Sequence, residues 1–150
     1  MNRRSFVGSA AAVSLAALSA AAVAAEGQQH AGHAAAKATS NPYEAARQAA
    51  AHCVSAGQLC LEYCIRVLSS GDTSMAKCAK GVNQMLALCG ALQNLAAQNS
   101  PLAAELAKVC IKACKECAEA CKEHAAHHAE CKACHESCLA CIKECEKIAA

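Results

Sequence analysis

Small and apolar side chains recur every three or four residues from about residue 41 onward, with polar and charged residues between them. This is the period of an α-helix that buries one face. No segment shows the two-residue alternation of a half-buried strand. The pattern predicts helices with two well-marked stripes, which consist of Ala46, Ala50, Cys53, Gly57, Cys60, Cys64 and Val67 and of Met75, Cys78, Val82, Met85, Cys89 and Leu92.

Turn and capping residues divide the pattern into segments. Pro42 follows a candidate cap at Ser40 or Asn41, which predicts a first helix from there to about Ser69. Residues 69–72 contain Gly71 and predict a turn, followed by a second helix over about 73–98. Pro101 then opens a third helix.

The end of the third helix is not fixed by periodicity. No Gly or Pro interrupts residues 102–148, so one long helix is open as an alternative. A single helix of that length would leave its stripe unburied unless it formed an intermolecular coiled coil. A turn at His124–His128 gives four helices of comparable length. We therefore expect an all-α fold, an antiparallel up-down-up-down four-helix bundle over residues 41–150 with a cysteine-lined core.

The first 40 residues differ from the rest. Arg3 and Arg4 precede an apolar run that reaches Ala22-Val23-Ala24, which predicts a signal peptide over residues 1–25, of the twin-arginine type, and export to the periplasm. Residues 26–40 lack an apolar period and predict a flexible tail that contains His30 and His33.

Removal of the leader leaves a chain without excess charge, because 12 basic residues then face 12 acidic ones. A neutral chain whose only aromatic residues are Tyr43 and Tyr63 is not expected to bind nucleic acid. We also expect no membrane association after the leader is removed.

Fourteen cysteines on inward stripes are the main chemical signal. Nine of them lie between Cys110 and Cys145 at gaps of three or four residues, apart from one gap of ten. Neighbours at these gaps on one helix have Cβ atoms about 5–6 Å apart, whereas a disulfide needs about 3.5–4.5 Å. A disulfide scaffold is therefore disfavoured, and metal binding is the stronger interpretation.

The choice of metal follows from ligand number and charge. Zinc takes closed sets of four ligands, and a ladder along helices shows no discrete group of four. The spacing of Cys131, Cys134 and Cys138 differs from the ferredoxin iron–sulfur run. Cu(I) prefers thiolates and accepts two or three of them. If each thiolate bridges two Cu(I) ions, the core is neutral at on the order of 14 ions per chain. The candidate ligands are Cys53, Cys60, Cys64, Cys78, Cys89, Cys110, Cys114, Cys117, Cys121, Cys131, Cys134, Cys138, Cys141 and Cys145.

Antiparallel helices also predict what lies at each end. The turns near residues 71 and 126 share one end, which gathers Met75, Cys78, His124, His127 and His128. This end could form a mouth that admits the metal. The candidate ligands assigned to the mouth are Met75, Met85, His124 and His128, since thioethers bind Cu(I) well.

Several segments together resemble the bacterial copper storage proteins, which are cysteine-lined four-helix bundles. They are His52-Cys53 with Cys60 and Cys64, Met75-Ala-Lys-Cys78, Cys89-Gly-Ala-Leu92 and the run from Cys110 to Cys145 with its histidine cluster. The resemblance implies a turn at the histidines, Cu(I) bound mainly by cysteine pairs, a mouth with Met and His, and homo-oligomers, namely tetramers in exported members. Tyr63 stands at a position where the resemblance implies a histidine in some members.

The predicted function is storage of multiple Cu(I) ions, for later supply to copper enzymes or copper chaperones, for copper detoxification, or for both. A store needs no catalytic residues, so we do not expect an enzyme. The alternatives are an iron–sulfur or thiol-redox protein and a zinc-stabilised interaction module. The first would need an exposed reactive thiol or discrete four-cysteine sites, and the second would need closed groups of four ligands.

Overall fold

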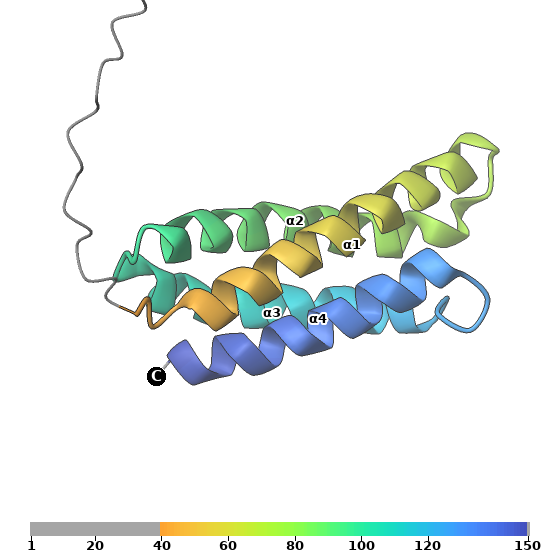
Figure 1. Cartoon of the computed structure of the whole chain (residues 1–150). Coiled ribbons are helices and arrows are strands. Elements are labelled where there is room, and N and C mark those ends of the chain that lie inside the picture. The colour runs from red at the N-terminus through yellow and green to blue at the C-terminus, as the bar shows by residue number, and fades with distance from the viewer. Residues whose placement is uncertain (1–39, 150) are drawn as a thin grey trace, which may run out of the picture. The chain divides into compact units, whose positions relative to one another are not determined.

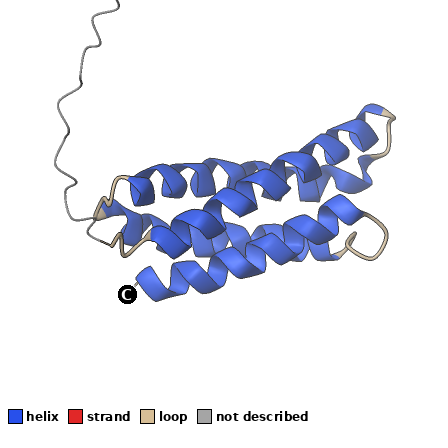
Figure 2. Cartoon of the chain, viewed as in Figure 1, coloured by secondary structure: helices blue, strands red, loops and turns tan. Residues whose placement is uncertain are grey.

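The computed structural model describes residues 40–149, which form four long helices (Figure 1). They are α1 (Glu44–Ser69), α2 (Ala76–Ala97), α3 (Leu102–Lys122) and α4 (Ala129–Ile148), and a 3-10 turn, η1 (Thr73–Met75), precedes α2. Residues 40–149 contain no strand (Figure 2). The predicted all-α class is confirmed. The predicted signal peptide and nearly all of the histidine-containing tail, residues 26–39, lie outside the described residues.

Each helix packs antiparallel to its two neighbours in a closed ring. The Asn41 side-chain amide donates to the Ala96 carbonyl at 2.7 Å, which joins the start of α1 to the end of α2. Tyr63, near the end of α1, meets His128 at the start of α4. An ion pair between Lys77 and Glu123 joins the start of α2 to the end of α3. The up-down-up-down arrangement follows from these pairings and is visible in Figure 1.

The turns form where the sequence supplies their special residues. Gly71 adopts a φ of 90° after α1, a left-handed conformation that side chains with a Cβ disfavour. The Asp72 carboxylate then accepts a hydrogen bond from the Ser74 amide at 2.9 Å and caps η1. Asn99 ends α2 with a φ of 52°, and the Ser100 hydroxyl accepts from the Leu102 amide at 3.3 Å at the start of α3.

The chain between α3 and α4 turns at residues 123–128, as predicted. The alternative of one continuous helix is wrong. The physical reason is burial, because folding back at this point encloses the sulfur stripes of both helices, whose cysteines are all fully buried.

The interior has two parts of different chemistry. Sulfur lines it from the η1 end as far as Cys110 and Cys145, and buried apolar side chains lie at the opposite end. That apolar end contains Leu92, Ala96, Ala46, Ala50, Ala103 and Ala107, all buried.

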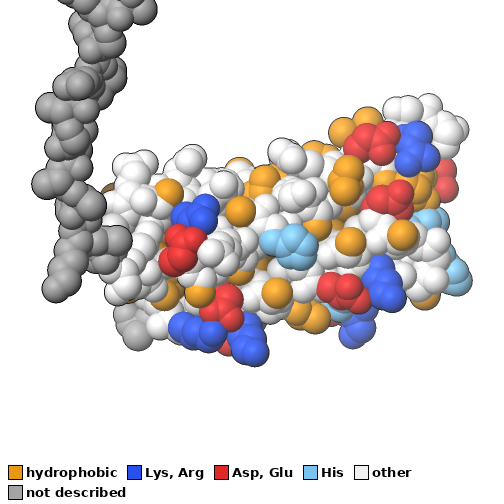
Figure 3. Space-filling view, viewed as in Figure 1, with side chains coloured by type: hydrophobic (Ala, Val, Ile, Leu, Met, Phe, Trp, Pro, Cys, Tyr) orange, Lys and Arg blue, Asp and Glu red, His pale blue; other side chains and the backbone are white. Residues whose placement is uncertain are grey.

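The outer surface carries short-range charge pairs (Figure 3), such as Lys147 with Glu144 and Arg66 with Glu62. These pairs are exposed and each stabilises the fold by less than about 1 kcal/mol. Among the described residues, no helix has the length and apolar character needed to cross a membrane.

Candidate metal centre

All fourteen cysteines lie in the described bundle, are free thiols and have no solvent exposure. Their sulfur atoms approach one another across helix boundaries. The Sγ–Sγ distance is 3.5 Å for Cys78 and Cys121, 3.8 Å for Cys60 and Cys78, and 3.6 Å for Cys53 and Cys138. These separations exceed a disulfide bond of about 2 Å and leave room for a metal ion bound to both sulfurs.

Neighbours along one helix are also close. The sulfur atoms of Cys117 and Cys121 lie 4.0 Å apart in α3, and those of Cys141 and Cys145 lie 3.8 Å apart in α4. The four-residue spacing therefore places thiols side by side, as the sequence predicts.

The thiols form four groups in which all sulfur atoms lie within 4.8 Å of one another. Three groups contain three cysteines, and the fourth contains Cys53, Cys89, Cys114 and Cys141. The sequence argument that the ladder has no discrete group of four is therefore wrong. Cysteine spacing within a single helix cannot reveal this group, because each of the four helices contributes one thiol to it at the same height along the bundle axis.

Two thiols toward the η1 end of the core are held in the neutral form by burial. Burial raises the pKa of the Cys64 and Cys131 thiols from 9.0 to about 12, because the charged thiolate loses its hydration there. A metal ion must therefore displace a proton from each of these groups, which makes metal binding weaker in acid.

The two core methionines lie in different places. Met75 belongs to η1 at the turn end and is buried, as expected for the mouth. Met85 is not at that end, which corrects its prediction as a mouth ligand. Its Sδ accepts a hydrogen bond from the Cys53 thiol at 3.4 Å in the middle of the core. Gly57 makes room for it, since a Cβ at Gly57 would lie 2.5 Å from Met85 Cε.

The histidines of the α3–α4 turn gather at the same end as Met75. The ring centroid of His128 lies 6.3 Å from that of His124 and 6.5 Å from that of His127. His128 Nδ1 lies 2.7 Å from the Tyr63 hydroxyl. Figure 3 shows histidine atoms at this end of the visible face. His124, His128 and Met75 thus lie at the same end of the bundle, the end that the two turns share.

A sequence model described as copper storage protein matches residues 39–150. The chain belongs to the copper storage protein family. The resemblance inferred from its cysteine and histidine segments is thereby confirmed. A comparison with curated protein sequences gives no match.

Solved structures of copper storage proteins share the fold. The apo form of copper storage protein 3 from Bacillus subtilis is 24% identical, with a TM-score of 0.63, over 72% of this chain and 99% of that one. A Cu(I)-bound copper storage protein, BsCsp3, is also 24% identical, with a TM-score of 0.65, over 73% and 99%. At this identity the likeness shows the fold alone.

Two polar residues beside the thiols of this copper storage protein were not predicted. Ser137 is buried, donates to the Cys134 carbonyl at 2.8 Å and lies 3.8 Å from Cys53 Sγ. The sequence marks Tyr63 only as a departure from the family pattern and does not indicate its contact with His128. The position of Ser137, three residues after Cys134 on the same helix, could have indicated that Ser137 faces the core. No sequence signal pairs Tyr63 with His128.

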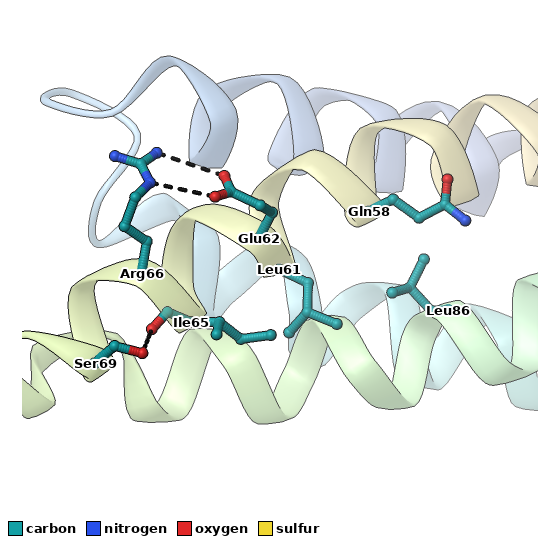
Figure 4. Close-up of a pocket in the computed structure, with 7 residues that line it drawn as sticks. All are labelled: Gln58, Leu61, Glu62, Ile65, Arg66, Ser69 and Leu86. Atoms are coloured by element: carbon teal, nitrogen blue, oxygen red, sulfur yellow. Dashed lines mark hydrogen bonds and ion pairs between the residues drawn. The ribbon is translucent and has the colours of Figure 1, made fainter. Parts of the chain in front are cut away.

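A hollow on the surface of the described bundle is separate from the thiols. It has a volume of about 600 Å³ and lies along α1 beside α2 (Figure 4). Its lining is apolar and charged, with Leu61, Ile65, Leu86, Gln58, Glu62, Arg66 and Ser69, and it includes no sulfur. This hollow therefore offers no thiol ligand to a metal ion.

Proposed function

We propose that this protein stores multiple Cu(I) ions inside its bundle, at about one ion per cysteine thiolate. The observation that carries the proposal is the core itself, in which fourteen free thiols are fully buried and approach one another across all four helices. Thiolate is the preferred ligand of Cu(I), and membership of the copper storage protein family supports the same metal.

Charge supports a large capacity. Ser137 is the only buried polar residue among residues 40–149, and no Lys or Arg is buried there. Isolated thiolates in such a core would be costly. One Cu(I) per thiolate gives a neutral interior, so filling stops near the thiol count of on the order of 14 ions.

Copper is proposed to pass through the mouth formed by Met75, His124 and His128. Thioether and imidazole groups both bind copper, and all three residues lie at the end where sulfur reaches the surface turns. The opposite end offers no such route, since Leu92 and Ala96 are fully buried there and Asn41 bonds across it.

The setting of this store is also a proposal. The leader supports export to the periplasm by the twin-arginine route, and the stored copper would supply copper enzymes or chaperones, or limit copper toxicity. A tetramer is the assembly that the family resemblance implies. The role proposed is that of a store rather than of an enzyme.

A Cu(I) titration tests the storage proposal. Reduced protein lacking residues 1–25 is titrated anaerobically against a chromogenic Cu(I) chelator, with thiols counted in parallel. A plateau near the thiol count supports a store, whereas saturation at one or two equivalents would overturn it. Iron with visible absorbance in the purified protein would favour the iron–sulfur alternative instead.

A further inference from the structure

Four cysteines at one height along the bundle axis, here called the four-thiol level, differ from the other thiols of the core. Cys53, Cys89, Cys114 and Cys141 each come from a different helix, and their four sulfur atoms lie within 4.8 Å of one another. All four side chains are fully buried. The other thiol groups among the described residues contain three members each.

Two of the distances between these four sulfurs are close to those of a tetrahedral ion. A Zn–S bond of about 2.3 Å implies about 3.8 Å between the sulfurs of a tetrahedral site. The Sγ atom of Cys89 lies 3.5 Å from that of Cys114 and 4.0 Å from that of Cys141. The other four distances are at most 4.8 Å, so an ion at the centre draws the four sulfurs together by about 1 Å or less.

A continuous chain of thiols connects this level with the mouth. The sulfur of Cys131 lies 3.9 Å from that of Cys60, which lies 4.0 Å from that of Cys121. Cys121 in turn lies 4.0 Å from Cys117. Cys117, Cys134 and Cys138 form one group, and Cys138 lies 3.6 Å from Cys53. An ion can therefore reach the four-thiol level by exchange from one thiol pair to the next.

We propose that Cys53, Cys89, Cys114 and Cys141 bind one divalent tetrahedral ion of the Zn²⁺ class when copper is absent. The thiols lose their protons to solvent as the ion binds, so that four S–H bonds are exchanged for four Zn–S bonds. The site lies inside the proposed copper store but is a distinct function, and binding of the divalent ion to copper-free protein does not depend on the Cu(I) capacity of the core.

Charge sets the order in which the two metals bind. Four thiolates and one Zn²⁺ leave two negative charges in a core where the only buried polar side chain is that of Ser137, 3.8 Å from Cys53 Sγ. Cu(I) leaves no such excess, because each ion balances one thiolate. Cu(I) therefore displaces the divalent ion, which occupies the site only in protein that is not loaded with copper.

Co²⁺ is the probe for this site, because tetrahedral cobalt thiolates absorb visible light and Zn²⁺ does not. Reduced protein without its leader is titrated anaerobically with Co²⁺. We expect tetrahedral d–d and sulfur-to-cobalt bands that saturate at one equivalent. Zn²⁺ should remove them one for one, and Cu(I) should also remove them. Absence of tetrahedral bands, or saturation well above one equivalent, would overturn the proposal.

Variants locate the ion. Cys89→Ser should abolish or shift the tetrathiolate bands, and Cys141→Ser should do the same from a different helix. Cys131→Ser is the matched control, since Cys131 is buried in α4, belongs to none of the four groups and contacts Cys60 rather than a member of the proposed site. Circular dichroism checks that each variant is folded. If Cys89→Ser does not fold, Cys141→Ser provides the test. Bands that survive both Cys89→Ser and Cys141→Ser would contradict the assignment. A Cu(I) plateau near the thiol count would leave the storage proposal standing in either case.

Discussion

Cysteine has one heavy atom beyond Cβ, and in this bundle it occupies fourteen positions where helix bundles usually carry leucine or isoleucine. Each methylene that is missing from a core forgoes about 0.8 kcal/mol of hydrophobic stabilisation. Met85, Leu92 and Val82 are the largest fully buried side chains. The apo core therefore has few large groups, and each of them matters more than it would in a leucine core.

Gly57 leaves the space that the Met85 side chain occupies. We expect Gly57→Ala to be less stable than Gly90→Ala, although both replace a helical glycine. At Gly90 nothing lies within 4 Å of a new Cβ, so alanine should stabilise the fold by about 0.5–1 kcal/mol. At Gly57 the same gain is offset because Met85 Cε and Leu86 must move. Denaturant unfolding of the reduced apo variants measures the difference, and equal stabilities would contradict it.

The Tyr63 hydroxyl fixes His128 at the mouth. Tyr63→Phe removes the 2.7 Å hydrogen bond and should lower the free energy of unfolding by about 1 kcal/mol. The Cu(I) capacity should not change, because no thiol is lost. Tyr43→Phe is the control, since the Tyr43 hydroxyl makes no hydrogen bond with residues 40–149. If the two variants are equally stable, the Tyr63–His128 bond contributes nothing measurable.

At the scale of the helices, periodicity and capping residues predicted most of the fold. Gly71 and Pro101 marked two turns correctly because residues with special backbone conformations leave clear sequence signals. The turn at His124–His128 has no such residue, so only the need to bury both stripes favoured it. Single-helix reasoning could not place Met85 at mid-core or find the four-thiol level, because both depend on the relative heights of helices.

The apolar end of the bundle stabilises the fold independently of metal binding. Leu92→Ala should destabilise the apo protein by about 2–5 kcal/mol, because Leu92 is fully buried and its removal leaves a cavity. The Cu(I) capacity should be unchanged, since the substitution removes no thiol. Thermal unfolding and the Cu(I) titration test the two halves of this expectation. The exposed Leu102 offers a matched control, for which Leu102→Ala should have little effect.

For the whole molecule, metal and protons compete for the same thiols. Cys64 and Cys131 have a pKa of about 12 in the fold, above the ordinary 9.0. The folded apo protein therefore holds these protons more tightly than the unfolded chain does. Their stabilising effect is complete below about pH 9 and is lost as the pH rises towards 12.

We accordingly expect reduced apo protein to unfold more easily at pH 10 than at pH 7. Anaerobic urea unfolding at the two pH values measures this, and copper-loaded protein is the control because its thiols carry no protons to lose. A stability that is equal or higher at pH 10 would contradict the assignment. Loading should also raise the melting temperature, because Cu(I) bound to the native state shifts the unfolding equilibrium.

The apolar closure beside Asn41 and Ala96 has a consequence for the history of the stored ions. If copper enters and leaves only through the proposed mouth, the ions that enter first lie farthest from it. Two copper isotopes loaded in succession would then leave in reverse order, provided that ions leave the mouth faster than they exchange places along the column. The order in which copper ions entered the protein would therefore determine the order in which they are released.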